Sequence, residues 1–517
     1  MITINETFKK GILSNNIHQI KFKGSNNIEE NTTTDRPKIN YINSDNDLEI
    51  DWEDFTYNDN THEHTPAKFR LKYTGDKKSF TSNIKFKING ITGIDDSNEF
   101  NIECNGKLEL KPLRFHNISE ETKTINLSAT ASGLFGNNLD IDYQISFDEP
   151  NSWKNLRKVT IEPLYLTVQS FTIPAGESLW VRSNEMSSWY IENNHFYFNS
   201  DNIGGIELGG DIMSLIKSED MPTYCFYHLF DNLSALTSFA DDFSLSSKLN
   251  ENCYNGMFYN CTSLETIPAN LLPAETLVSG CYNAMFSCCT GLKTIPADLL
   301  PAKTLANYCY QDMFNGCTGL ENIPADLLPA TTLTNANSCY KQMFMGCTKL
   351  ETIPENLLQA RELSSNCYES MFNGCTGLTN IRKNLLPAST LSYECYKEMF
   401  KGCTSLTSVA SDLLPSTRLA GYCYRGMFMG CTGITTAPTL PAPTLVNYCY
   451  VEMLRNCSNL NNITMLATNI ATKCFDDWVS GVSSSGTFIK YVNTTIPSGN
   501  NGIPSGWTVQ SYVPTNN

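Results

Sequence analysis

The sequence has little of what most catalytic and nucleic-acid-binding proteins rely on. Only 6 of its 517 residues are histidine, and 37 Lys and Arg are outnumbered by 53 Asp and Glu. The net charge of −16 argues against nucleic acid as a main partner, because a phosphate backbone attracts basic surfaces. No run of 18 apolar residues occurs, so we expect no membrane insertion. Residues 1–10 also lack the basic start and apolar core of a signal peptide, which favours assembly in the cytoplasm over export.

Catalytic motifs are absent as well. The chain has no nucleophile elbow and no phosphate-binding glycine loop, and His228 is the one histidine of the repeat region described below. Asp298, Asp326 and Asp412 recur at one position before Leu-Leu-Pro or its equivalent, which indicates a role in turns rather than in acid–base chemistry. We therefore expect a protein that is not an enzyme and has no cofactor.

One chelate-like pair stands outside the repeats. His62 and His64 lie two residues apart, on one face of an extended segment. Three copies in a trimeric fibre would offer six imidazole nitrogens to a metal. In a polar loop we expect solvated histidines instead, with the metal site as the alternative.

What the sequence does have is one repeated phrase, Cys-Tyr-x-x-Met-Phe-x-Gly-Cys-Thr-x-Leu-x-x-Ile-Pro-x-x-Leu-Leu-Pro-Ala-x-Thr-Leu. Its period is 28 residues, with slips to 30, 26 and 25, and a fixed period in this range is typical of solenoids. Degenerate copies begin at Cys225 and Cys474. The opening cysteines of the full copies are Cys253, Cys281, Cys309, Cys339, Cys367, Cys395, Cys423 and Cys449.

Within one copy, Cys309, Met313 and Cys317 are spaced by four residues. This spacing predicts one apolar face of a short helix of about two to three turns, which Gly316 would end. Leu320–Ile323 then predicts a short extended segment that pairs with its equivalent in the next copy. Such a unit has too small a core to fold alone, so neighbouring copies must stack.

The cysteines fit this core. Of the 20 in the chain, 19 lie in the repeat region and Cys104 lies outside it. Two cysteines eight residues apart on a helix are about 12 Å apart, which is too far for a disulfide. We expect reduced, buried thiols that pack as small hydrophobes, with adjacent Cys288 and Cys289 as the odd pair.

The segment from Met313 to Ile323 resembles the cysteine-containing leucine-rich repeats of gut-bacterial surface proteins, the BspA-like class, and of phage tail and fibre proteins. The Cys-Tyr and Leu-Pro-Ala-x-Thr-Leu elements resemble a variant common in Bacteroides and its phages. Residues 210–216, 486–488 and 502–507 resemble its opening and closing segments. The resemblance covers about 165–510 and implies a leucine-rich-repeat solenoid, a scaffold that hosts many binding tasks.

The expected fold class is α+β, with a short helix and a short strand in each repeat. Before the repeats, side chains alternate with period two, as in Phe69, Leu71 and Tyr73, which predicts antiparallel strands. The expected parts are a polar arm at 1–45, an immunoglobulin-like β-sandwich anchoring domain at 46–162, a β-rich N-terminal cap at 163–220, the solenoid at 221–482, and a C-terminal cap and tail at 483–517.

A candidate binding face lies on the extended segments, whose polar residues vary while the core does not. Stacked strands would align them in one row, and solenoids commonly bind along such a row. The alternative is that these side chains are merely solvated. The candidates are Glu265, Lys293, Glu321, Asn322, Glu351, Thr379, Asn380, Thr407 and Thr435.

Together these observations favour a noncatalytic phage virion protein, a fibre or appendage on the virion surface. Its N-terminal module would attach to other virion proteins, and its solenoid would contact a glycan or protein of the host surface. The alternative is an adhesin on a bacterial cell surface. The ligand, attachment to capsid or tail, and self-association into a homo-oligomer are left open.

Overall fold

The computed structural model describes residues 111–129, 143–147, 153, 169–183, 195–216 and 220–513, and elsewhere only the backbone of the strands given below. The chain divides into two compact units, Met1–Lys111 and Pro112–Asn517. The described part is a mostly-β fold with a β-solenoid. Its one helix is a single 3-10 turn, η1 (Ile212–Leu215), in which the Asp211 carboxylate caps the Met213 amide.

The described strands of the first unit form two three-stranded antiparallel sheets and one two-stranded ribbon. The strand predicted around Phe69 is present, and two strands lie within the segment expected to be a polar arm. The sheets are β1 (His18–Ile20), β6 (Ala67–Tyr73) and β3 (Leu48–Asp54); β2 (Lys38–Asn43), β7 (Phe80–Asn89) and β8 (Phe100–Cys104); and β4 (Tyr57–Asn58) with β5 (Glu63–His64).

The second unit begins with two sheets whose apolar faces pack together, as Phe115 meets Phe198 with ring centroids 5.0 Å apart. The six-stranded sheet runs in the order β12 (Lys154–Asn155), β11 (Tyr143–Ser146), β14 (Ser178–Ser183), β9 (Leu113–Asn117), β17 (Ile206–Gly209) and β18 (Leu236–Phe239). The four-stranded sheet runs β13 (Leu166–Ile173), β10 (Lys123–Thr130), β16 (Asn194–Asn199) and β15 (Tyr190–Ile191).

These sheets place the boundary between units differently from the sequence analysis. Strands from before residue 162 pair with strands from after it, as β9 does with β14 and β17. The boundary therefore lies at Lys111 and Pro112 rather than at 162. Parallel pairing of β17 with β18 carries the sheet into the first coil, so this region covers the solenoid's first core face.

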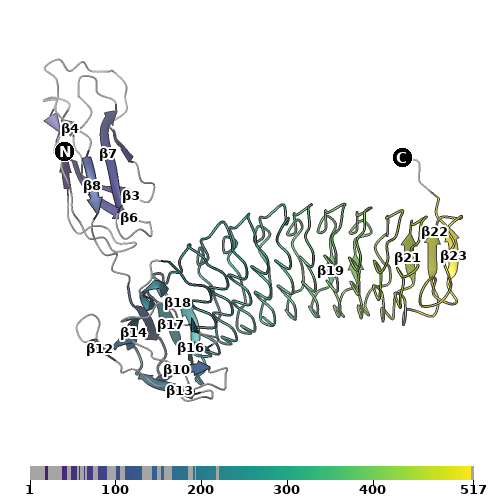
Figure 1. Cartoon of the computed structure of the whole chain (residues 1–517), viewed down its shortest axis with the longest axis horizontal. Helices are drawn as coiled ribbons and strands as arrows, with labels where there is room; N and C mark the ends of the chain where they lie inside the picture. Colours follow the sequence, from purple (N-terminus) through teal and green to yellow (C-terminus); the bar gives the residue numbers. More distant parts are fainter. Residues whose placement is uncertain are drawn as a thin grey trace. The chain divides into compact units, whose positions relative to one another are not determined.

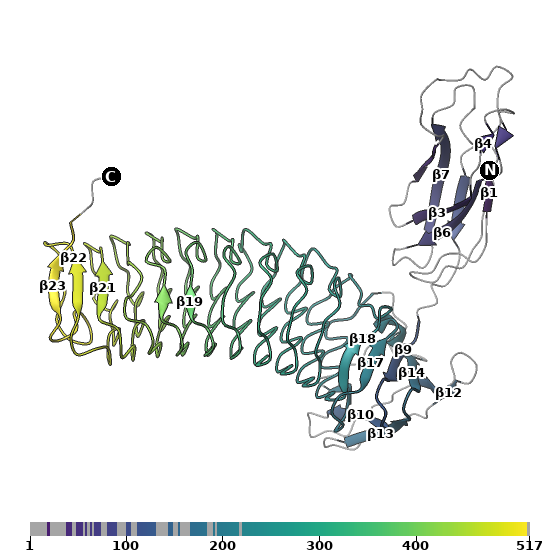
Figure 2. The same ribbon diagram turned by 180° about the vertical axis from the view of Figure 1, so that it is seen from behind.

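Coil stacks on coil from β18 to the C-terminal end, as Figures 1 and 2 show. The extended segments pair in parallel as expected: Thr352 bridges Asn380, and β19 (Asn380–Ile381) pairs with β20 (Ser408–Val409). A second row of parallel bridges joins the Thr-Leu ends of successive copies, such as Thr276 to Thr304. Each coil thus binds its neighbours along two extended rows.

The predicted helix in each repeat is wrong. Its place is taken by overlapping tight turns in which every fourth residue is left-handed, such as Asn252, Gly256 and Asn260 with φ of 53°, 61° and 56°. An α-helix of L-residues cannot hold such positions at regular intervals. The apolar pairs recur every four residues because the turns do, and a helical face has nearly the same period.

Hydrogen bonds show why these turns are stable. Successive amides donate alternately to the next coil and to their own turn. Tyr254 N–H donates to the Cys281 carbonyl of the next coil, whereas Asn255 N–H donates to the Asn252 carbonyl of its own turn. Gly256 and Met257 repeat the alternation. Every amide of the run is therefore bonded, half within the coil and half between coils, which satisfies a buried backbone without a helix.

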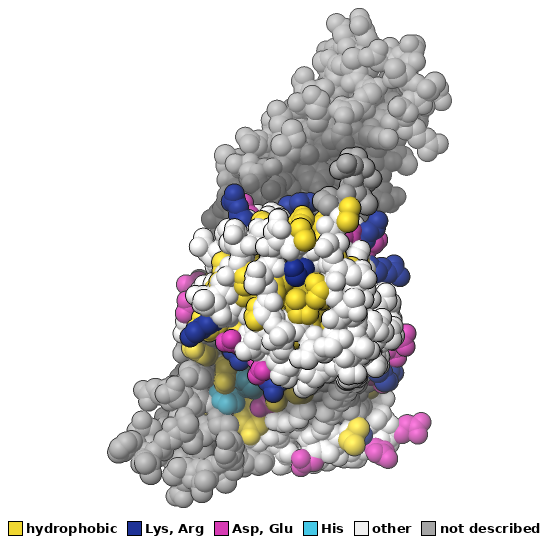
Figure 3. Space-filling model, turned by 90° about the vertical axis from the view of Figure 1, so that its right-hand side faces the viewer, with side chains coloured by type: hydrophobic (Ala, Val, Ile, Leu, Met, Phe, Trp, Pro, Cys, Tyr) yellow, Lys and Arg dark blue, Asp and Glu magenta, His cyan; other side chains and the backbone are white. Residues whose placement is uncertain are grey.

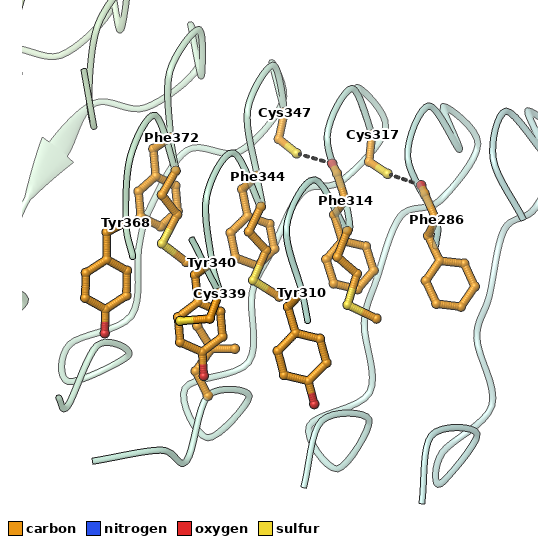
Figure 4. Packing of buried hydrophobic residues seen from close by; sticks show 14 of the residues in the cluster. Phe286, Tyr310, Phe314, Cys317, Cys339, Tyr340, Phe344, Cys347, Tyr368 and Phe372 are labelled. Carbon is orange, nitrogen blue, oxygen red and sulfur yellow. Dashed lines mark hydrogen bonds between the residues drawn. The ribbon is translucent and has the colours of Figure 1, made fainter. Parts of the chain in front are cut away.

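Beneath the turns, the aromatic side chains form two continuous stacks, visible in Figure 4. Phe344 lies between Phe314 and Phe372, with ring centroids 5.6 and 5.7 Å away, and Tyr340 lies in the parallel tyrosine stack. All the side chains predicted as core in the copy beginning at Cys309 are buried. Each stack therefore runs through the neighbouring coils, which explains why one copy has too little core alone.

The 19 cysteines of the repeat region form no disulfide and are buried as predicted, except Cys288, which is half-buried. The second cysteine of each full copy has a further role, since its thiol donates to the phenylalanine carbonyl of the preceding coil; Cys347 Sγ lies 3.3 Å from the Phe314 oxygen (Figure 4). The same oxygen accepts the Cys317 amide. A cysteine here fills space and binds the adjacent coil.

The C-terminal end continues the solenoid with a parallel sheet of β21 (Asn462–Met465), β22 (Thr487–Lys490) and β23 (Thr508–Ser511). Phe488 and Trp507 in this end are buried, and the Trp507 indole donates to the Ser483 carbonyl at 2.8 Å. Viewed onto this end, Figure 3 shows hydrophobic side chains near its centre with a basic side chain beside them, and most of the other charged side chains around the rim.

Candidate binding surfaces of the solenoid

The strand face, defined as the two variable residues after the first leucine of each extended segment, forms a row as predicted. Lys293 N–H donates to the Glu265 carbonyl at 3.5 Å, and Glu321 N–H donates to Lys293 at 3.2 Å. Further along, Thr407 donates to Thr379 at 3.0 Å. All nine candidates are exposed except Asn380, which is half-buried. The Glu351 carbonyl accepts from Thr379 N–H, although Glu351 N–H takes no part in this ladder, and the Thr435 carbonyl accepts from residues of the next coil. Asn322 follows Glu321 in the sequence and belongs to the same row.

The chemistry of this face changes along its length. Near its start, Lys293 and Glu265 form an ion pair at 3.8 Å, but both side chains are more than half exposed. A pair of this kind contributes little to stability. Further on, the Thr379 and Thr407 hydroxyls each lie 3.4 Å from a carbonyl of the preceding coil. The threonines therefore partly serve the coil itself, and the charged start is the more available for a ligand.

The turn face, made by the overlapping turns, carries charges that are bonded to one another. The Glu369 carboxylate lies 3.0 Å from Lys341 Nζ and 3.1 Å from Lys397 Nζ, and Asn366 donates to it at 2.9 Å. Burial raises the pKa of Glu369, but these cationic and amide donors outweigh burial and lower it overall. This network joins three successive coils, so its residues act in cohesion.

A groove of about 690 Å³ opens on neither of these faces but on the loops that follow the extended segments. Its volume lies within the range of small-molecule sites. Three coils contribute to it, and most of its wall is polar. The lining residues are Ala325, Asp326, Thr331, Glu355, Asn356, Leu358, Gln359, Arg361, Asn384 and Pro387.

Sequence reasoning missed this groove, although it treated Asp326 as a turn residue. A signal was present, since the copy beginning at Cys339 breaks the repeated phrase at the groove. Gln359 stands where every other full copy except the last, which has Leu466, carries proline, and Glu362 stands where most copies have threonine. Arg361 occupies the x position of the phrase, which varies from copy to copy. The 30-residue spacing before Cys339 is also the longest in the array.

An aromatic cluster lies at the first coil, around the histidine that the sequence singled out. The His228 ring centroid lies 4.4 Å from that of Tyr227 and 5.8 Å from that of His195, and His228 Nδ1 is 3.3 Å from Asp231. Burial, with a smaller effect of His228, lowers the pKa of His195 to about 4. Parts of the chain near this cluster in sequence, such as 184–189, lie outside the described residues.

The thiols are poor candidates for catalysis. Burial raises the pKa of Cys309 and of Cys375 to about 12, so both are protonated at neutral pH, and a thiol must ionise to act as a nucleophile. Among the described residues, no three His, Cys, Asp or Glu side chains are grouped so as to hold a metal ion. His62 and the side chain of His64 lie outside the described residues.

Searches of protein-family models, curated proteins and solved structures find no match to this chain. In the described part, no helix is long and apolar enough to cross a membrane. The function must therefore be argued from the surfaces themselves.

Proposed function

We propose that this chain is a noncatalytic adhesion protein whose solenoid presents a polar surface to a partner. The observation that carries the proposal is the contrast within each coil. The core residues hardly change from copy to copy, while the exposed residues of the strand face and of the adjacent loops do. Solenoids commonly bind along such extended faces, because stacking holds variable side chains on a constant frame.

The setting we propose is a phage virion, in which the protein forms a fibre or appendage and contacts a glycan or protein of the host surface. The resemblance of the repeat phrase to that of phage tail and fibre proteins supports this setting. The strands of Met1–Lys111 form a separate compact unit, which suits a module that attaches to other virion proteins. The second candidate is an adhesin on a bacterial cell surface, which the same resemblance also supports.

Two measurements test this proposal. Mass spectrometry of purified phage particles, with antibody labelling of the repeats in electron microscopy, should find the protein at fixed stoichiometry on particles. Its presence only on bacterial envelopes would favour the second candidate. Beads coated with the full chain should bind host cells, and beads that bind neither cells nor isolated envelope material would contradict adhesion altogether.

A further inference from the structure

The loop groove differs from the turn face of the solenoid in having free polar groups. On the turn face, Lys397 contacts both Glu369 and Glu394. In the groove, the side chains of Glu355 and Arg361 form no hydrogen bond or ion pair with any residue that the structure describes. Their charges are therefore available to a ligand without breaking a contact of the fold.

The groove is also held on a firm backbone. Arg361 N–H donates to the Thr331 carbonyl at 3.2 Å, and Leu333 N–H donates to Glu362 at 2.8 Å, so two of the contributing coils are bonded beside it. On the wall, Asn356 and Asn384 are left-handed, with φ of 62° and 64°, whereas Asp326 is not. The turn therefore changes conformation between the first contributing coil and the next two. Asparagine tolerates that conformation well, and a fixed backbone keeps the polar groups in place.

The mixture of groups indicates the class of ligand. Asp326 and Glu355 are acceptors, Arg361 is a donor, and the Gln359 and Asn356 amides are both. An anion would face two carboxylates, and a cation would face the guanidinium. A neutral ligand rich in hydroxyl groups meets neither repulsion, because each hydroxyl donates to a carboxylate and accepts from a guanidinium or amide. Exposed Ala325 and half-buried Pro387 add a small apolar surface for carbon atoms.

We propose that this groove is a binding site for a neutral oligosaccharide. The inference rests on the proposed adhesion function and deepens it, since it names both the place on the solenoid and the chemistry of the partner. The copy beginning at Cys339, which departs from the repeated phrase at Gln359 and Glu362, contributes half of the lining residues, from Glu355 to Arg361.

The test is a glycan array that carries neutral, anionic and amino-sugar oligosaccharides, probed with the full chain, followed by calorimetric titration of the best binder. The double variant Gln359→Pro with Arg361→Thr restores residues found at the same positions in neighbouring copies, so it should fold. We expect a neutral oligosaccharide to bind, and the variant to weaken its affinity by about tenfold or more, since a hydrogen bond to a charged group is lost.

The matched control is Lys303→Thr, which makes an equivalent change to Thr in a copy outside the groove and should leave affinity unchanged. A second variant, Glu355→Gln, removes the charge alone and should weaken binding less than the double variant. Binding that is confined to anionic or amino sugars, or that both variants leave unchanged, would overturn the inference. If beads coated with the chain still adhere to host cells in that case, the adhesion function stands and only the groove assignment fails.

Discussion

The turn face and the loop side of each coil are built from the same repeat, yet they treat polar groups in opposite ways. On the turn face nearly every amide is bonded, alternately within and between coils, and Glu369 is held by two lysines and an asparagine. On the loop side, Glu355 and Arg361 face solvent without partners among the described residues. Polar side chains therefore join neighbouring coils on the turn face, whereas the polar side chains of the loop side are free to vary.

The largest effect should follow a break in the ring stack beneath the turn face. Phe344→Ala removes a fully buried ring that contacts rings of both neighbouring coils, and we expect it to lower the free energy of unfolding by about 3–5 kcal/mol. Chemical denaturation measures the change. Thr352→Ala, an exposed position of the strand face, is the control and should lie within about 0.5 kcal/mol of the wild type. Equal losses of unfolding free energy in the two variants would mean that the strand face contributes as much to stability as the ring stack beneath the turn face.

A smaller effect should follow from the ion-pair network. Glu369→Gln should lower the free energy of unfolding by about 2 kcal/mol at neutral pH, because charge-assisted hydrogen bonds to two lysines are lost. The folded-state pKa of Glu369 is lowered, so its contribution is present above the unfolded pKa of about 4.3 and is lost as pH falls through the folded value.

Denaturation curves at neutral and at acidic pH check this prediction. The difference between wild type and Glu369→Gln should shrink below about pH 4 as both states become protonated. Glu265→Gln on the strand face, whose ion pair is exposed, should change the unfolding free energy little at any pH. A difference for Glu369 that persists undiminished in acid would show that the network is not electrostatic.

The smallest effects concern the left-handed positions. Gly374 has φ of 74° and room for a Cβ atom, so Gly374→Ala should cost only the left-handed strain, about 1 kcal/mol. Cys288 occupies the same position in another copy with φ of 61°, and Cys288→Gly should stabilise the protein by a similar amount. Thermal unfolding of each variant measures the two changes in stability. Changes of the same sign would contradict the turn geometry.

Much of the solenoid could be predicted from the sequence. The period, the buried core of each copy and the parallel pairing of the extended segments follow from repetition and from alternation of apolar residues, and the structure confirms them. Buried thiols were also predictable, because 19 cysteines in register indicate core positions. That these thiols donate to carbonyls of the preceding coil was not, since the bond depends on the spacing between coils.

The helix was predicted wrongly because two structures share its signal. Apolar residues four apart fit a helical face, but they also fit turns that recur every four residues. The third left-handed position of each run is Gly or Asn in every copy except at Cys288, as in Asn260, Gly346 and Gly430. One such residue resembles a helix end. The regular recurrence of Asn252, Gly256 and Asn260 indicates turns.

The groove illustrates the limit for the candidate site. Gln359 and Arg361 are visible departures from the repeated phrase, yet a departure alone does not show whether a surface is raised or hollowed. The shape of the surface depends on how the loops of three coils meet. The backbone of these loops changes between Asp326 and the equivalent Asn356, which is left-handed. The strand face could be predicted because parallel pairing of the extended segments is enough to place equivalent residues of successive copies in one row.

Hydrogen–deuterium exchange of the full chain, read by mass spectrometry, tests the contrast between the two sides most directly. The account predicts slow exchange across the turn run at 366–375, where the amides bond within and between coils, and faster exchange across the loop at 382–389, where few amides do. The same difference should recur in every copy. Equally fast exchange in both segments would contradict the closed turn face and with it the proposed division between cohesion and binding.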